Sequence, residues 1–187
     1  MSAMRLFVAL ALPADLRGRL CALSSGLPGA RWVAEENLHL TLRFLGGLDG
    51  NEAADVDAAL AAVRMPGFEL RLEGVSHFGE GRKLRSIWTG VQANPALVRL
   101  RDKVEQAVVR AGLPPEKRKF KPHVTLARFK SNPGVKLYDF LAQYALFQAE
   151  PFQVERFTLY SSFLSASGAI YRPEAEYPLE RIESGVF

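Results

Sequence analysis

The sequence predicts an α+β fold of two similar lobes, with mainly antiparallel sheets, helices on the outside and a central cleft. Strand and helix patterns follow one another in the order β-α-β-α-β-β and then α-β-α-β-β. Each half carries one strand with a His-x-Thr motif, and we expect these two strands to face the cleft. Since no linker or low-complexity segment separates the halves, residues 1–187 are expected to form one domain.

Local patterns identify the elements of the first half. Pro13 suits the first turn of a helix, and the leucines that follow recur at helical spacing. Asp49 is a candidate N-cap, because its side chain can accept hydrogen bonds from a helix start. The expected elements are a strand at 4–12, a helix over Leu12 to Leu27, the His39 strand, a helix with its apolar face from Val56 to Val63, and strands at 68–78 and 86–92.

The second half repeats this layout. Leu97, Leu100, Val104 and Val108 lie on one helical face, and Gly112 suits the end of that helix. The remaining expected elements are the His123 strand, a helix through Leu137, Phe140, Leu141 and Tyr144, and strands at 152–164 and 169–179.

Two of the three histidines share a four-residue frame, His-Leu-Thr-Leu and His-Val-Thr-Leu, which begin at His39 and His123. The chain has only four threonines, so the repetition of Thr at the second position after His indicates one element used twice. Side chains alternate between the faces of a strand. His39 and Thr41 are therefore expected on one face, and His123 and Thr125 on one face of the second strand.

A pair of imidazoles with a pair of hydroxyls suits phosphoryl chemistry. Histidine titrates near neutral pH and can donate or accept a proton, while a threonine hydroxyl can donate to an anionic oxygen. A single histidine on a strand is more often a surface or core residue, and His77, which lacks the threonine, is expected to be structural. A metal site is the weaker alternative, because no carboxylate or cysteine stands at ligand spacing beside His39 or His123.

These motifs resemble the two-histidine (2H) phosphoesterase superfamily, and more closely the bacterial and archaeal RNA 2′,3′-cyclic phosphodiesterases, also called 2′-5′ RNA ligases. The resemblance covers nearly the whole chain. It includes the opening Arg5 to Leu10, the segment from Trp32 to Gly46, the segment from Phe120 to Arg128, and Leu159 to Ser162 with Gly168 and Tyr171. It implies a two-lobed architecture with strands exchanged near a pseudo-twofold axis.

The resemblance also implies an activity, which is hydrolysis of RNA 2′,3′-cyclic phosphodiester ends to 2′-phosphomonoesters without a cofactor or metal. It assigns His39 as the proton donor to the departing 3′ oxygen and His123 as the acceptor of the proton from water. Thr41 and Thr125 would hold the non-bridging oxygens. Two alternatives stay open: reversible 2′-5′ joining of RNA ends, and a non-catalytic module that binds RNA ends.

Other residues are candidates for contacts with substrate. Strict alternation puts Arg128 opposite His123, so Arg128 reaches a phosphate only if the strand twists or bulges. The same alternation puts Arg43 on the His39 face. Aromatic side chains can stack on unpaired bases, which makes Phe7 and Trp32 candidates. The basic run that includes Lys119 and Lys121, and the loop from Arg82 to Arg85, are candidates for contacts with the RNA backbone.

Composition agrees with a monomeric enzyme of the cytoplasm that acts on RNA ends or 2′,3′-cyclic nucleotides. The net charge is +4 at pH 7, which suits a polyanionic partner. One cysteine, Cys21, excludes a disulfide within the chain and fits a reducing compartment. The apolar run from Phe7 to Leu12 is too short to span a membrane and is expected to be a strand.

Overall fold

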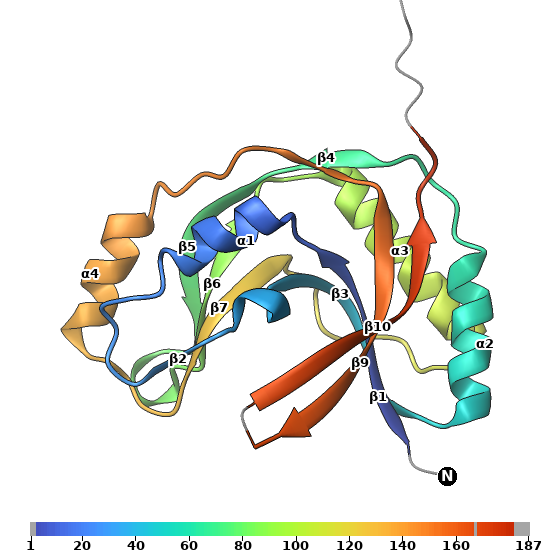
Figure 1. Cartoon of the computed structure of the whole chain (residues 1–187), viewed down its shortest axis with the longest axis horizontal. Helices are drawn as coiled ribbons and strands as arrows, with labels where there is room; N and C mark the ends of the chain where they lie inside the picture. The colour runs from blue at the N-terminus through green and yellow to red at the C-terminus, as the bar shows by residue number, and fades with distance from the viewer. Residues whose placement is uncertain (1–2, 167, 182–187) are drawn as a thin grey trace, which may run out of the picture.

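In the computed structural model, which describes residues 3–166 and 168–181, a continuous eight-stranded sheet joins the two halves of the chain (Figure 1). Its strand order is β10-β9-β1-β3-β7-β6-β5, and β2 pairs with β7 beside β3. All strand pairs of this sheet are antiparallel. The α+β class and the antiparallel sheet were thus predicted correctly.

The sheet divides into two lobes that meet at its centre, where β3 and β7 share a single residue pair, Leu40 with Val124. The first lobe holds β1 (Met4–Ala11), β3 (His39–Leu48), β9 (Arg156–Ser165) and β10 (Gly168–Pro178). The second holds β2 (Ala30–Trp32), β5 (Leu72–Phe78), β6 (Ser86–Val91) and β7 (His123–Phe129).

The lobes exchange strands, as the family resemblance implied. Strand β2 comes early in the chain but pairs with β7 of the second lobe. The hairpin of β9 and β10 comes last and pairs with β1, the first strand (Figure 1). The first lobe uses strands from both ends of the chain, and the second takes β2 from between β1 and β3, so neither lobe is a contiguous piece of sequence.

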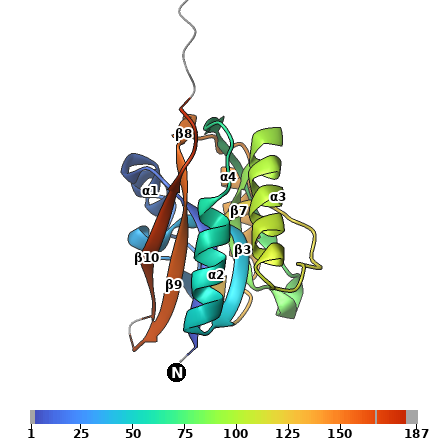
Figure 2. The same cartoon turned by 90° about the vertical axis from the view of Figure 1, so that its right-hand side faces the viewer.

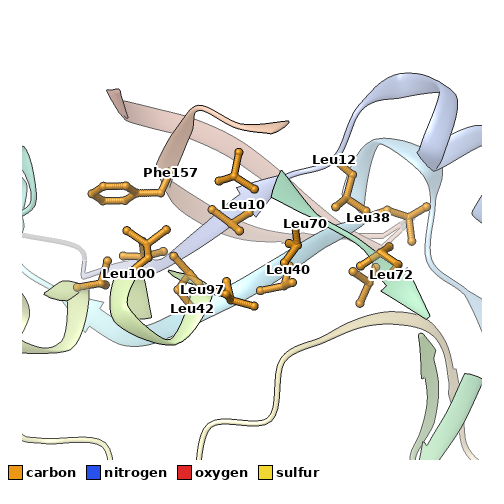
Figure 3. Close-up of a cluster of buried hydrophobic side chains, with 14 of the residues drawn as sticks. Leu10, Leu12, Leu38, Leu40, Leu42, Leu70, Leu72, Leu97, Leu100 and Phe157 are labelled. Atoms are coloured by element: carbon orange, nitrogen blue, oxygen red, sulfur yellow. The ribbon is translucent and has the colours of Figure 1, made fainter. Parts of the chain in front are cut away.

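Helices cover the sheet on its apolar sides. Helix α3 (Pro95–Arg110) begins with Asn94, whose side chain accepts from the amide of Leu97 at 3.0 Å, and with Pro95 in the first turn. The side chains of Leu97 and Leu100 pack near Leu40 and Leu42 of β3 (Figure 3). Burial of these apolar side chains thus stabilises the core-facing side of β3, the strand that carries His39.

Helix α2 (Gly50–Ala61) lies beside α3, as Figure 2 shows. Asp49 accepts hydrogen bonds from the amides of Asn51 and Glu52, both at 2.9 Å, and the carboxylate of Glu52 accepts one from the amide of Asp49 at 2.9 Å, which completes a capping box. This confirms the predicted cap. Helix α4 (Val135–Tyr144) covers the second lobe. Among the described residues, no helix has the length and apolarity needed to cross a membrane.

Three predicted elements differ from the structure. Helix α1 (Ala14–Cys21) ends well before Leu27, and the chain turns again at Gly26, which has a positive φ of 79°. Leu23 and Leu27 are nevertheless buried. The leucine spacing therefore identified buried positions correctly, but not the length of the helix.

The predicted strands at 68–78 and 152–164 are each divided in two. Strands β4 (Phe68–Leu70) and β8 (Phe152–Val154) pair with each other in a separate small sheet, while β5 and β9 belong to the main sheet. Phe68, Leu70 and Leu72 are all buried. The alternation of apolar residues therefore continues from β4 into β5, and the pattern gives no sign of the break between the two strands. Two short 3₁₀ helices, η1 (Glu35–Asn37) and η2 (Gly81–Lys83), lie in connections.

Candidate active site

The two His-x-Thr segments lie next to each other at the junction of the lobes. Leu40 and Val124 are paired across antiparallel strands and fully buried. One step to either side of this pair, His39 stands opposite Thr125, and Thr41 stands opposite His123. All four of these polar residues are half-buried on the other face of the sheet. The prediction that each histidine lies on the same strand face as its threonine is confirmed. The strand pairing places two imidazoles and two hydroxyls together; we call His39, Thr125, Thr41 and His123 the histidine square.

Both imidazoles are oriented by the same local contact. Nδ1 of His39 donates to the carbonyl of Asn37 at 2.6 Å, and Nδ1 of His123 donates to the carbonyl of Lys121 at 2.7 Å. In each case the carbonyl belongs to the residue two positions earlier. Because a carbonyl can only accept, Nδ1 carries the proton and Nε2 is the basic nitrogen of the neutral ring. The hydroxyl of Thr41 donates to Nε2 of His39 at 3.0 Å.

Burial and nearby positive charge lower the pKa of both histidines. For His39 burial has the largest effect, and the charges of Arg128 and His123 add to it, against the hydrogen bond to Asn37. For His123 burial again lowers the pKa most, the hydrogen bond to the Lys121 carbonyl opposes this effect, and the charges of Arg128 and Lys121 lower the pKa further. In the empty site both rings are therefore held toward their neutral forms, so either can act as a base, and an acid requires that a bound anion stabilise the imidazolium.

A bulge in β7 brings Arg128 to the site. In the pairing of β6 with β7, Ile87 is opposite Ala127 and Trp88 is opposite Thr125, so Leu126 is an extra residue. Ala127 consequently points into the core with Leu126, and Arg128 returns to the face of His123, where it is exposed. The effect of its charge on both histidines agrees with this position. The condition stated for Arg128, that its strand must bulge, is met.

Strand β3 has a matching bulge with a different consequence. Here Leu42 is the extra residue, because Val8 pairs with Arg43 and Ala9 pairs with Thr41. Arg43 is turned away from His39 and is only 9% exposed, which corrects the expectation that it lies on the histidine face. Its Nε donates to Glu105 of α3 at 2.5 Å, and its terminal nitrogens donate to the carbonyls of Phe44 and Pro114, both at 2.6 Å.

The same bulge places Phe44 on the site face with 53% of its surface exposed. Phe44 and Arg128 are each the fifth residue after a motif histidine, so the two bulges bring an aromatic ring to one side of the site and a guanidinium to the other. Simple alternation missed Phe44. The position it shares with Arg128 in the two motifs was the feature of the sequence that could have identified it.

Aromatic rings enclose His39. Phe7 and Tyr171 lie 5.0 and 5.2 Å from the imidazole centroid, and Phe7 stacks on Tyr160 at 5.3 Å. Phe7 is only 3% exposed but lines the same pocket as His39, Tyr160 and Tyr171, so its contact with a base stays a prediction. Trp32 packs against Phe140 of α4 at 5.9 Å, on the core side.

His123 has its own aromatic and basic neighbours. Phe78 and Trp88 lie 4.9 and 5.8 Å from its ring, and the ammonium of Lys121 sits 5.1 and 4.7 Å from the same two aromatic rings. These cation–π contacts hold Lys121 at the edge of the site. Lys119 is exposed further along the same segment. His77 is separate from the site and contacts the carbonyl of Gly79 in its own loop.

Comparison with known families agrees with this arrangement. The family model described as "2′-5′ RNA ligase superfamily" matches residues 13–162, which include both motifs. The chain belongs to this superfamily. Within the described residues, no group of three or more His, Cys, Asp and Glu side chains could hold a metal ion.

Relatives and solved structures place the chain more closely within the superfamily. An RNA 2′,3′-cyclic phosphodiesterase of Aeropyrum pernix is 35% identical over 162 residues, which are 83% of this chain and 92% of that protein. One from Archaeoglobus fulgidus is 33% identical over 173 residues, 90% of this chain and 97% of the relative. The crystal structure of E. coli LigT with 3′-AMP has a TM-score of 0.79 and 28% identity, and the match covers 95% of this chain and 98% of LigT.

Proposed function

We propose that this protein hydrolyses the 2′,3′-cyclic phosphate at the end of an RNA and leaves a 2′-phosphomonoester. The observation that carries the proposal is the square of His39, Thr125, Thr41 and His123 at the lobe junction, with the charge of Arg128 acting on both imidazoles. Relatives of similar length that are named RNA 2′,3′-cyclic phosphodiesterase support the same substrate class.

The reaction needs one base and one acid on opposite sides of the phosphorus. We assign the base to Nε2 of His123, which takes a proton from water as the water oxygen bonds to phosphorus. His39 is the acid: its Nε2 gives a proton to the 3′ oxygen as the P–O3′ bond breaks. The phosphate remains on the 2′ oxygen. Afterwards His123 holds the proton and His39 has lost one, so exchange with solvent resets the site.

The remaining polar groups act on charge. We assign the hydroxyls of Thr41 and Thr125 and the guanidinium of Arg128 to the non-bridging oxygens, where negative charge concentrates during attack. Once Nε2 of His39 is protonated it no longer accepts from Thr41, so the Thr41 hydroxyl is free to donate to the phosphate. Binding of this anion also raises the pKa of the imidazoles, which offsets the effect of burial and lets His39 hold the proton that it donates.

The exposed ring of Phe44 suits the nucleobase. An aromatic face stacks on an unpaired base without demanding a particular sequence. Phe44 lies at the end of the site away from Arg128, because β3 and β7 are antiparallel and both side chains follow their histidines by five residues. A terminal nucleotide could therefore place its base on Phe44 and its phosphate between the histidines.

Product identity tests the proposal. The purified protein is incubated with 2′,3′-cyclic AMP and with an oligonucleotide that ends in a cyclic phosphate, and products are separated against 2′- and 3′-phosphate standards. We expect only the 2′-phosphate, with activity retained in EDTA. A 3′-phosphate product would contradict the assignment of His39 as acid to the 3′ oxygen. Joined 2′-5′ products would show that a 5′-hydroxyl replaces water, and binding without turnover would indicate a binding module.

We also propose that the chain acts as a monomer in the cytoplasm, and that residues 1–187 form one domain. The single sheet shared by both lobes supports the domain assignment. Light scattering after size-exclusion chromatography would measure the mass in solution, and a dimer would contradict the proposal of a monomer.

A further inference from the structure

Two arginines face each other on adjacent strands at the Arg128 end of the site. Arg31 of β2 is the register partner of Arg128 of β7. The pairs on either side, Trp32 with Ala127 and Ala30 with Phe129, contribute side chains that pack on the core. Partners in an antiparallel pair share a face, so Arg31 and Arg128 both point to the side of the histidines. Both are exposed.

Neither guanidinium is neutralised by a carboxylate. The ion pairs of the described residues use Arg43, Arg101, Arg118 and Arg156, and none uses Arg31 or Arg128. Like charges directly opposite each other across two strands destabilise the sheet. An anion bound to both would remove this repulsion, so the pair is better suited to the bound state than to the empty one.

The position of the pair separates two tasks. Arg128 follows the bulge in β7 onto the face of His123, where it is exposed and its charge acts on both histidines, so we assign it to the scissile phosphate. The pair stands four residues along β7 from Val124, the partner of Leu40, which corresponds to about 13 Å. Arg31 lies on β2, one strand away from Arg128, and its charge is not among the causes that lower the pKa of either histidine, so we place it outside the reacting centre but within the span of a bound oligonucleotide.

We propose that Arg31 binds the phosphodiester that precedes the terminal nucleotide. The pair would then hold two successive phosphates, with Arg128 on the cyclic phosphate and Arg31 on its neighbour, and would favour RNA ends over free cyclic nucleotides. This inference rests on the proposed function, because it names the substrate of that same site.

A double-mutant cycle that combines protein variants with modified substrates tests the contact between Arg31 and the internal phosphodiester. The variants are Arg31→Gln and the matched control Arg99→Gln, which removes an exposed arginine from α3. The substrates are 2′,3′-cyclic AMP, a dinucleotide that ends in a cyclic phosphate, and the same dinucleotide with a neutral methylphosphonate in place of its internal phosphodiester. The measured quantity is kcat/KM at low and at high salt.

We expect Arg31→Gln to lower kcat/KM for the normal dinucleotide about tenfold, as for loss of one charge-assisted contact. The mononucleotide and the methylphosphonate dinucleotide should change less than about twofold, because neither carries the charge that Arg31 binds. The variant should also depend less steeply on salt, since one phosphate contact is lost. Arg99→Gln should match the original protein throughout.

Three outcomes would overturn the inference. An equal loss on the mononucleotide would place Arg31 at the cyclic phosphate itself. Unchanged values on all substrates would mean that Arg31 binds no phosphate, and an equal loss on the methylphosphonate would show that charge is not recognised. If the original protein hydrolysed none of these substrates, the proposed function would fail, and binding of 2′-phosphorylated dinucleotides with either linkage would still decide whether Arg31 contacts the internal phosphate.

Discussion

At the scale of single residues, the two histidines are arranged alike and yet must do opposite work. Each donates from Nδ1 to the carbonyl two residues earlier, and each has a lowered pKa because of burial and the charge of Arg128. Their different roles in hydrolysis must therefore come from the substrate, which presents water on one side and the 3′ oxygen on the other.

Removal of either imidazole should disable the site. We expect His39→Ala and His123→Ala each to lower kcat for 2′,3′-cyclic AMP by about 10²- to 10⁴-fold, since each leaves an acid without a base or the reverse. The double variant should lose much less than the product of the two effects, because the groups act as a unit. His77→Ala is the control and should keep full activity. A single motif variant with half the original activity would refute the assignment at that position.

The pH profile should report the influence of Arg128. Catalysis requires one protonated and one neutral imidazole, and both pKa values in the free protein are lowered from 6.5. The optimum of kcat/KM should therefore lie below pH 6.5, because at higher pH the acid loses its proton. Arg128→Gln removes a positive charge, so both pKa values should rise and the optimum should move to higher pH. If Arg128→Gln reduced kcat but left the pH optimum unchanged, Arg128 would act in phosphate binding and would not set the pKa values of the histidines.

At the scale of elements, the two bulges decide which side chains reach the substrate. Without Leu42 and Leu126 as extra residues, Arg43 would lie on the histidine face and Arg128 would point into the core. With the bulges, Arg43 is buried against α3 and Arg128 is exposed in the site. A shift of one residue thus decides whether an arginine is buried in the core or exposed on the histidine face.

The two arginines should therefore respond differently to substitution. Arg43→Met leaves the carboxylate of Glu105 largely buried without its partner, and we expect a loss of about 3 kcal/mol in the free energy of unfolding, measured in urea. Arg128→Gln should change stability little and reduce kcat strongly. Replacing Glu105 with Gln in the Arg43→Met background should recover part of the stability. If the Arg43→Met protein were stable but inactive, Arg43 would have a role in the active site rather than in stability.

At the scale of the whole molecule, positive charge gathers around the junction of the lobes. Arg128 and Arg31 stand at one end of β7, and the segment before β7, which contains Lys119 and Lys121, stands at the other. The net charge of +4 makes the field of the protein attractive to RNA. Within the basic segment, Arg118 is paired with Glu116 at 3.2 Å, so its charge is partly offset.

Neutralising the basic segment should affect long substrates only. Conversion of Lys117, Arg118 and Lys119 to Gln should weaken binding of an oligonucleotide, and the difference from the original protein should shrink as salt rises, because these contacts release counterions. Hydrolysis of 2′,3′-cyclic AMP should stay unchanged, since the three side chains are exposed and lie outside the histidine square. Loss of mononucleotide hydrolysis in a folded variant would place the segment in the catalytic site.

Features that depend on neighbouring residues could be predicted from the sequence. The two His-x-Thr frames, the cap at Asp49 and the periodic apolar face of α3 are properties of neighbouring residues, and the structure has them as predicted. Strand alternation also placed each histidine and threonine on one face, because that rule holds as long as the strand is regular.

The other features could not be predicted from the sequence, because they depend on pairing between segments that are distant in the chain. A bulge exists only relative to a partner strand, so the positions of Phe44, Arg43 and Arg128 could not be obtained from alternation within one strand. The neighbourhood of Arg31 depends likewise on the register of β2 against β7. The two His-x-Thr motifs can be identified in the sequence itself. Strand register, which is set by burial of the apolar face, decides which other side chains stand beside them.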